Sequence, residues 1–242
     1  MTIELSPHER ERFGISAARC FLSEPEEMGG ADAFCAANGV QMAIIRCRTD
    51  RIDVAQAVER AGGALMDCLV YYRLPLAQAP AVGANPNAVA RAFEVRDKAA
   101  VDEIAAAAFE GYFGHYHADP RLDAHAADEA YRDWARNSCT PDTAIVAHDA
   151  EDRVVGFASL RKTAEDEHDA ALFAVDPSAR RKGIFTLLLQ GAVRFAWERG
   201  SRACTYSTQI TNVAANRAIV RNGFAFDYAL YTFHKWFDGA RV

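Results

Sequence analysis

Hydrophobic and polar positions along this chain predict strands and helices in alternation. In the first 75 residues or so, three apolar runs are expected to be strands: FGISAARCFL, VQMAIIRCR at Val40–Arg48, and ALMDCLVYYRL at Ala64–Leu74. Between the last two, DVAQAVERAGG predicts a short helix that stops at Gly62 and Gly63. This part is therefore expected to be a small β-α-β-α-β unit that serves as a scaffold or as dimer support.

A larger alternation follows LAQAPAVGANPN, in which Pro80, Gly83 and Pro86 among small residues are typical of a linker. AFEVRD predicts a strand leading into the helix KAAVDEIAAAAF, TAIVAHD and VVGFASLRK predict a hairpin, and DAALFAVD predicts a further strand. RACTYST predicts a strand, NVAANRAIVRNG a helix, and FAFDYALYTFHKWF a final strand pair. The predicted division is a small β/α domain at 1–78, a linker at 79–88 and a larger domain at 89–242.

The join between a strand and a long helix, LFAVDPSARRKGIFTLLL, carries the strongest chemical signal. The strand is expected to end at Val175, Pro177 enforces a turn, and Arg180–Gly183 open a helix that Gly200 terminates. Free amides at a helix start, a glycine and three cations favour a pyrophosphate site, although a solvated basic surface has the same pattern. Neither a Walker loop nor a GxGxxG fingerprint is present.

Composition excludes several classes of protein. Hydrophobic residues make up 50% of the chain, charged residues 25%, and the net charge of -6 argues against bulk nucleic-acid binding. Six cysteines without a CxxC argue against a zinc knuckle or a disulfide framework and favour a cytoplasmic protein. MTIELSPHERERF lacks the apolar core of a signal peptide, and no window reaches the roughly 18 apolar residues of a membrane span, so neither export nor membrane insertion is expected.

A second chemical signal is GHYHADP, which offers His115, His117 and Asp119 at alternate positions. Two imidazoles and a carboxylate can ligate zinc or iron when they converge, and the same residues can form a catalytic pocket. The surroundings of this stretch have to decide between the two.

VDPSARRKGIFTLLL resembles the acyl-CoA motif of the GNAT superfamily of N-acyltransferases, Arg/Gln-x-x-Gly-x-Gly/Ala. Arg180 and Gly183 match, whereas Phe185 stands where a second small residue is usual. The resemblance extends over Val89 to Phe237 and includes an Asn-x-x-Ala helix at Asn212 and Ala215. It implies an α/β fold with a mixed sheet, in which the acyltransferase fold is preceded by a smaller, truncated β/α domain.

Within the superfamily, the chain resembles nucleotide-amino-sugar N-acyltransferases of the dTDP-fucosamine acetyltransferase type. They share the short N-terminal domain, a strand like Gly156 to Arg161, and a Thr-Gln-x-x-Asn segment like Thr208 to Asn212. The resemblance implies an acetyl-CoA or other short acyl-CoA co-substrate, no metal, a nucleotide-linked amino sugar as acceptor, and a homodimer. Metal binding by GHYHADP is thereby disfavoured. The remaining interpretations are a contact with the sugar or a phosphate and an ordinary capped loop.

The resemblance, together with the chemistry of the residues themselves, suggests three sets of site residues. The acyl-CoA set is expected to be Leu172, Phe173, Ala174, Val175, Arg180, Arg181, Lys182, Gly183, Ile184, Phe185, Thr186, Asn212 and Ala215. The acceptor set is expected to be His115, Tyr116, His117, Asp119, Arg161, Thr208 and Gln209. The catalytic set is expected to be His117, His115, Tyr206, Phe173 and Ala174, the last two next to the reacting thioester.

Proton transfer is where the chain departs from its relatives. The tyrosine that often protonates the departing thiolate lies four residues beyond the motif alanine, and here that position is Ile219. Tyr206 is the nearest substitute, although it also suits the core or a ligand wall. His117, with His115 as second choice, can take the proton from the attacking amine because imidazole titrates near neutrality.

The predicted function is transfer of an acetyl or short acyl group from acyl-CoA to the amine of a nucleotide-linked amino sugar. One alternative is transfer to another amine, such as an aminoglycoside, a polyamine or a protein N-terminus. A CoA-binding module without turnover is the other, and Ile219 favours it.

Overall fold

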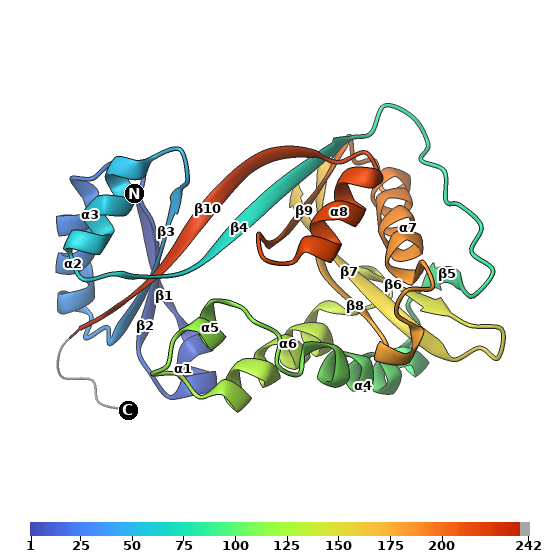
Figure 1. The fold of residues 1–242 in the computed structure, drawn as a ribbon, viewed down its shortest axis with the longest axis horizontal. Helices are drawn as coiled ribbons and strands as arrows, with labels where there is room; N and C mark the ends of the chain where they lie inside the picture. The colour runs from blue at the N-terminus through green and yellow to red at the C-terminus, as the bar shows by residue number, and fades with distance from the viewer. Residues whose placement is uncertain (238–242) are drawn as a thin grey trace. The chain divides into compact units, whose positions relative to one another are not determined.

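The computed structural model describes residues 1–237 (Figure 1). By their mutual contacts, these residues form two compact units. Unit 1 comprises 1–70, 113–127 and the chain from Tyr228 onward, and unit 2 comprises 71–112 and 128–227. Each unit is thus built from separate stretches of chain, and the predicted boundaries at residues 78 and 89 stay a prediction. None of the helices in the described part is both long and apolar enough to cross a membrane.

Unit 1 is a sheet with helices. Its elements are β1 (Thr2–Ser6), α1 (Pro7–Phe13), β2 (Ala17–Phe21), α2 (Glu27–Ala37), β3 (Met42–Arg48), α3 (Ile52–Arg60) and α5 (His115–Ala118), with parts of β4 (Ala64–Pro75) and β10 (Ala225–Trp236). Strand β2 pairs antiparallel with β1 and parallel with β3. The predicted strand pair at the end of the chain is wrong, because that segment is the single strand β10. It pairs antiparallel with β3, from Leu230 opposite Arg48 to Trp236 opposite Met42.

The apolar core of unit 1 covers one face of this sheet. Met28 and Cys35 of α2 and Val58 of α3 belong to one buried cluster with Ile45 and Phe233 of the strands. Because successive strand residues point to opposite faces, the neighbours of Ile45 and Phe233 along the strands face away from this core. That second face is mixed: it carries the polar residues Arg19, Arg46, Thr232 and His234 beside apolar residues such as Ile44.

Unit 2 is a mixed sheet between helices. Its elements are β5 (Val89–Ala92), η1 (Val95–Asp97), α4 (Lys98–Phe109), most of α6 (Ala124–Ser138), β6 (Ala144–His148), β7 (Val154–Ala164), β8 (Glu167–Val175), η2 (Pro177–Ala179), α7 (Ile184–Glu198), β9 (Ala203–Gln209) and α8 (Val213–Arg221). Strands β5 to β8 pair antiparallel in sequence order, and β9 pairs parallel with β8. Helices α4 and α7 both pack on β7 and β8, on opposite faces (Figure 1). The mixed sheet confirms the predicted fold class.

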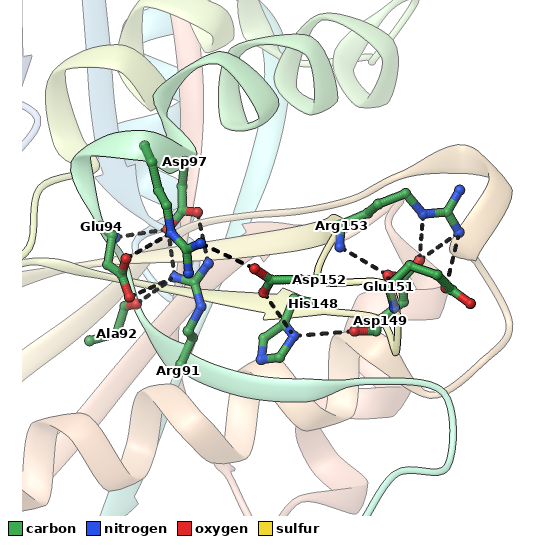
Figure 2. Close-up of polar contacts among 10 residues, drawn as sticks. Arg91, Ala92, Glu94, Asp97, His148, Asp149, Glu151, Asp152 and Arg153 are labelled. Carbon is green, nitrogen blue, oxygen red and sulfur yellow. Dashed lines mark hydrogen bonds and ion pairs between the residues drawn. The ribbon is translucent and has the colours of Figure 1, made fainter.

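The predicted strand AFEVRD is wrong, because β5 ends at Ala92 and a capped turn follows (Figure 2). The buried Asp97 carboxylate accepts the Glu94 amide at 2.8 Å and two bonds from the Arg91 guanidinium at 2.7 and 2.8 Å. Glu94 and Asp97 also form a reciprocal capping box. These local bonds end the strand and start α4, which covers the predicted helix from Lys98 to Phe109.

Candidate active site

The first feature of the candidate site is a gap between two parallel strands of unit 2. The pairing of β8 with β9 runs from Glu167 opposite Ala203 to Ala170 opposite Tyr206. Strand β8 continues to Val175, and over this last part the described strands pair it only with β7. The backbone from Leu172 to Val175 therefore has one free side. These are the residues predicted to hold the pantetheine arm and to face the thioester.

A β-bulge lies where the two strands separate. Ser159 of β7 pairs with Leu172, and the next residue, Leu160, pairs with Ala170, so Ala171 is an extra residue in β8. A bulge of this kind bends its strand and increases its local twist. The bend explains why β8 leaves β9 directly after Ala170.

The second feature is the loop from β8 to α7. Asp176 holds its start by accepting bonds from the Ser178 amide at 2.7 Å and the Ser178 hydroxyl at 2.6 Å. The loop then uses left-handed backbone at Arg181 (φ 66°) and Gly183 (φ 75°). Helix α7 begins at Ile184, so Arg180, Arg181 and Lys182 lie in the loop and not in the first turn as predicted.

The start of α7 leaves backbone donors available. Gly183 is its N-cap, and among the described residues no side chain caps it. The Leu187 amide bonds to the Gly183 carbonyl, whereas the amides of Ile184, Phe185 and Thr186 have no acceptor within the helix. Such donors, together with the positive end of the helix dipole, favour a bound anion. The residues present therefore fit the pyrophosphate of an acyl-CoA.

The predicted linker contributes to this loop, which the sequence did not indicate. Asn85 donates its side-chain amide to the Lys182 carbonyl at 3.0 Å, and the Gly83 amide donates to the Gln190 side chain on α7 at 2.9 Å. A Cβ atom at Gly183 would lie 2.9 Å from the Asn85 Nδ2 atom. The positive φ of Gly183 favours glycine, and a Cβ atom there would displace the end of the Asn85 side chain from its bond to Lys182.

Three aromatic rings gather beside the gap. The Phe173 centroid lies 5.1 Å from that of Tyr206 and 5.6 Å from that of Phe185. Phe185, which occupies the position where the GNAT motif usually has a small residue, is thus part of a ring cluster. Burial raises the pKa of Tyr206, with smaller contributions from Tyr112 and Asp169. The Tyr206 hydroxyl therefore stays protonated at neutral pH.

The residues predicted from the Thr-Gln-x-x-Asn segment are engaged in local structure. Asn212 caps α8 by accepting the Ala215 amide at 3.2 Å, and it donates to the Thr208 hydroxyl at 3.3 Å. Gln209 accepts a bond from the Tyr112 hydroxyl. Ile219 is 0% exposed, so it packs in the core and offers no polar group. Ligand contacts by these residues stay a prediction.

Asp169 is a residue that the sequence analysis missed. It precedes Ala170 on β8, and its side chain is buried. It accepts a bond from the Thr205 hydroxyl at 3.0 Å and one from the Arg161 guanidinium at 3.2 Å, so the predicted acceptor residue Arg161 is its ion-pair partner. Burial raises the pKa of Asp169 and outweighs the opposing effects of Thr205 and Arg161. A carboxylate within an otherwise apolar strand, DAALFAV, was the available signal.

The predicted histidines lie in unit 1, where GHYHADP forms the one-turn helix α5 and its C-cap. The His115 Nδ1 atom lies 2.9 Å from His234 Nε2, and His234 Nδ1 lies 2.7 Å from the Asp119 carboxylate, which also accepts the Trp236 indole N–H at 2.8 Å. The pKa of His115 is held well below its usual value, first by burial and then by the positive charges of His234, Arg46 and Arg19. His115 is therefore neutral at physiological pH.

The other side chains of the stretch point elsewhere. His117 Nδ1 accepts the Gly114 amide at 3.4 Å, and the Tyr116 hydroxyl contacts Glu9 and accepts from Arg19 at 3.0 Å. Within residues 1–237, no three His, Cys, Asp or Glu side chains gather in a way that could hold a metal ion. His115 and Asp119 are thus joined in a buried hydrogen-bonded chain through His234, and His117 lies outside this chain.

Comparison with known proteins shows the family of this chain. The sequence profile of the acetyltransferase (GNAT) family matches residues 100–224, and the chain belongs to this family. Strand β8 and the loop that leads into α7 lie within the matched residues. The chain is also 31% identical to the spore coat polysaccharide biosynthesis protein SpsD of Bacillus subtilis over 146 residues. That match covers 59% of this chain and 49% of SpsD, so the chain spans about half the length of this relative.

Solved structures share the fold at low sequence identity. A GCN5-related N-acetyltransferase from Sphaerobacter thermophilus has a TM-score of 0.70 at 17% identity, covering 97% of this chain and 76% of its own. A second, from Kribbella flavida, has a TM-score of 0.63 at 14% identity, covering 94% and 83%. At these identities the likeness concerns the fold alone.

Proposed function

We propose that this acyltransferase moves an acetyl or short acyl group from acyl-CoA to the amine of a nucleotide-linked amino sugar. The observation that carries the acyl-CoA part is the open edge of β8 next to the uncapped start of α7. The acceptor part is supported by the resemblance of the sequence to sugar-nucleotide enzymes and by the similarity to a polysaccharide biosynthesis protein. A homodimer and a cytoplasmic location stay predictions.

The reaction is a direct attack within a ternary complex. The amine lone pair adds to the thioester carbonyl carbon, the C–S bond breaks, and CoA leaves as a thiolate. Backbone amides on the free side of Leu172–Val175 are the donors proposed for the developing oxyanion. The loop cations and the α7 amides fix the pyrophosphate, which positions the thioester, and positioning of two bound reactants lowers the entropic part of the barrier.

Two groups are proposed to accept the proton that the amine must lose. Asp169 is supported by its place on β8, where its neighbour Ala170 is the last residue paired with β9, and by burial that raises its pKa. His117 is supported by its imidazole chemistry. We favour Asp169, because a buried carboxylate with a raised pKa is a stronger base than an ordinary one. Tyr206 is proposed as hydrogen-bond donor to the leaving thiolate, which with an ordinary thiol pKa of about 8.5 needs only modest help.

Thiol release from acetyl-CoA tests the function. The acceptors would be a dTDP-linked amino sugar, an aminoglycoside, a polyamine and a short peptide, with mass spectrometry of the product. Release that depends on the nucleotide sugar, with an acylated product, is the expected result. Thiol release with another amine would show that the acceptor belongs to that class of amine. CoA binding without thiol release would support a non-catalytic module, which the buried Ile219 favours.

A further inference from the structure

Unit 1 holds an unusual number of buried polar atoms without partners. Such atoms are rare in native proteins, and each calls for an explanation. Within residues 1–237, buried side-chain atoms without a hydrogen bond are Glu9 Oε2, Arg12 Nε, Arg19 Nε, Arg46 Nε, both Asp67 carboxylate oxygens and Thr232 Oγ1 in unit 1, and Arg91 Nε in unit 2. Most of these unpartnered atoms lie in unit 1, and those of Arg19, Arg46 and Thr232 lie on the sheet face opposite its apolar core.

Strand register places Arg19 and Arg46 as neighbours on that face. Arg19 of β2 lies opposite Ile44 of β3, and Arg46 lies two residues further along β3 on the same face. Residues in such diagonal positions lie about 7–8 Å apart, within reach of long side chains. Both arginines line one pocket of about 470 Å³, together with Glu4, which lies opposite Arg19 on β1. The apolar residues Ile44, Phe21 and Leu230 also line it. This volume lies in the range of pockets that bind small molecules.

The two arginines differ in how their charge is balanced. Arg19 donates to the buried Glu9 carboxylate at 2.7 Å and to the Tyr116 hydroxyl at 3.0 Å, so it is held in position. Arg46 makes no hydrogen bond or ion pair with any described side chain. The charge of Arg46 interacts with that of Asp67, a carboxyl group whose pKa is raised by burial. Arg46 is therefore a guanidinium with its donors uncommitted in a pocket wall.

We propose that this pocket of unit 1 binds the oxyanion group, phosphate or carboxylate, of a small molecule, with Arg46 as the principal donor and Arg19 beside it. A guanidinium presents a planar fork of donors that matches both oxyanions, and such charge-assisted bonds are strong. The apolar wall formed by Ile44, Phe21 and Leu230 suits the uncharged part of the ligand. This site is independent of the acyl-CoA loop, which belongs to unit 2.

Calorimetric titration tests the proposal with two probes, dTDP for a diphosphate and malonate for a carboxylate. Each titration is run at saturating CoA, so that the α7 loop is occupied. We expect one probe to bind wild type and Arg46→Gln to weaken it about tenfold or more, since a charged partner is lost. Arg46→Lys keeps the charge but loses the planar fork of donors. Its affinity for the probe should lie between those of wild type and Arg46→Gln.

Two further variants separate a binding site from a general charge effect. Arg60→Gln removes one positive charge from the exposed end of α3, outside the pocket, and should leave affinity within about twofold. Asp67→Asn removes the negative charge near Arg46 and should tighten binding. Absence of binding by both probes up to millimolar concentration, or equal affinity of wild type and a folded Arg46→Gln protein, would overturn the proposal.

Discussion

The buried histidine chain of unit 1 and the β8 edge of unit 2 are two polar regions with opposite character. In the chain, the ring nitrogens of His234 lie within hydrogen-bond distance of His115 and of the Asp119 carboxylate. At the β8 edge the side chains are mostly apolar, yet the backbone of Leu172–Val175 has one unpaired side. Satisfied polar groups stabilise a fold, whereas available ones can act on a ligand. We therefore propose the acyl-CoA site at the β8 edge, although its sequence is the less conspicuous of the two.

The largest expected effect is on turnover, and it compares the two candidate bases, Asp169 in unit 2 and His117 in unit 1. Asp169→Asn should lower turnover by about 10²–10⁴-fold, the usual contribution of a positioned base, whereas His117→Ala should change it only a few-fold. Burial raises the pKa of Asp169, so its ionised form costs stability above its unfolded pKa, and Asp169→Asn should not lower the melting temperature at pH 7. Steady-state thiol release and thermal unfolding measure both effects.

Asp166→Asn, in the exposed turn before β8, is the matched control and should retain activity. A loss of about 10²-fold or more in His117→Ala, with full activity in Asp169→Asn, would make His117 and not Asp169 the base.

The next largest effect concerns Gly183. Gly183→Ala should weaken CoA binding about tenfold or more, a loss of at least about 1.4 kcal/mol, because the new Cβ would lie 2.9 Å from Asn85 and the left-handed backbone would be strained. Gly200→Ala is the control, since Gly200 also has a positive φ (84°) but no neighbour within 4 Å of its Cβ position. Both variants should lose similar stability, and only Gly183→Ala should lose affinity by calorimetry. Equal affinities in the two would remove the loop from the CoA site.

A pH-dependent effect should appear in unit 1. The pKa of buried His115 lies well below its usual value, so the folded protein keeps it neutral while the unfolded chain binds a proton below about pH 6.5. The free energy of unfolding should therefore fall as pH drops from 7.5 to 5.5. In urea titrations, His115→Gln should show a smaller fall, and His125→Gln, on an exposed part of α6, should show the wild-type fall. An unchanged fall in His115→Gln would mean that His115 is protonated in the folded protein.

The smallest effect is expected at Asn85. Asn85→Ala removes the bond to the Lys182 carbonyl, and one net hydrogen bond of about 0.5–1.5 kcal/mol corresponds to a two- to tenfold loss in CoA affinity. Asn38→Ala, which removes a similar side-chain bond to the Phe34 carbonyl in unit 1, should leave CoA affinity unchanged. Full CoA affinity in Asn85→Ala would show that the loop holds its shape without the linker.

Local patterns predicted the elements well, because local forces decide them. The helix at Lys98–Phe109 and the hairpin of β6 and β7 follow from hydrophobic periodicity. The strand β1 and the helix α1 were not predicted, since MTIELSPHERERF has little apolar pattern and β1 depends on pairing with β2. The pairing of β10 with β3 joins residues almost 200 positions apart, which no local pattern can show.

The site was only partly predictable for the same reason. The cations and Gly183 were visible as a motif, but the β-bulge at Ala171 and the end of the β8–β9 ladder depend on strand register. The contact of Asn85 with Lys182 depends on the tertiary packing of a segment whose composition predicts a linker. The burial that gives Asp169 its raised pKa depends on neighbouring strands, so the sequence showed a carboxylate without its environment.

Amide hydrogen exchange with and without CoA tests the acyl-CoA site most directly. Bound CoA should slow exchange in Leu172–Val175 and in Ile184–Thr186, because its pantetheine and pyrophosphate would accept bonds from these amides. Met42–Arg46 in unit 1, already paired on both sides, should exchange as before. Protection of both unit 2 segments is the result that this account predicts. Saturating CoA that leaves exchange in both segments unchanged would contradict it.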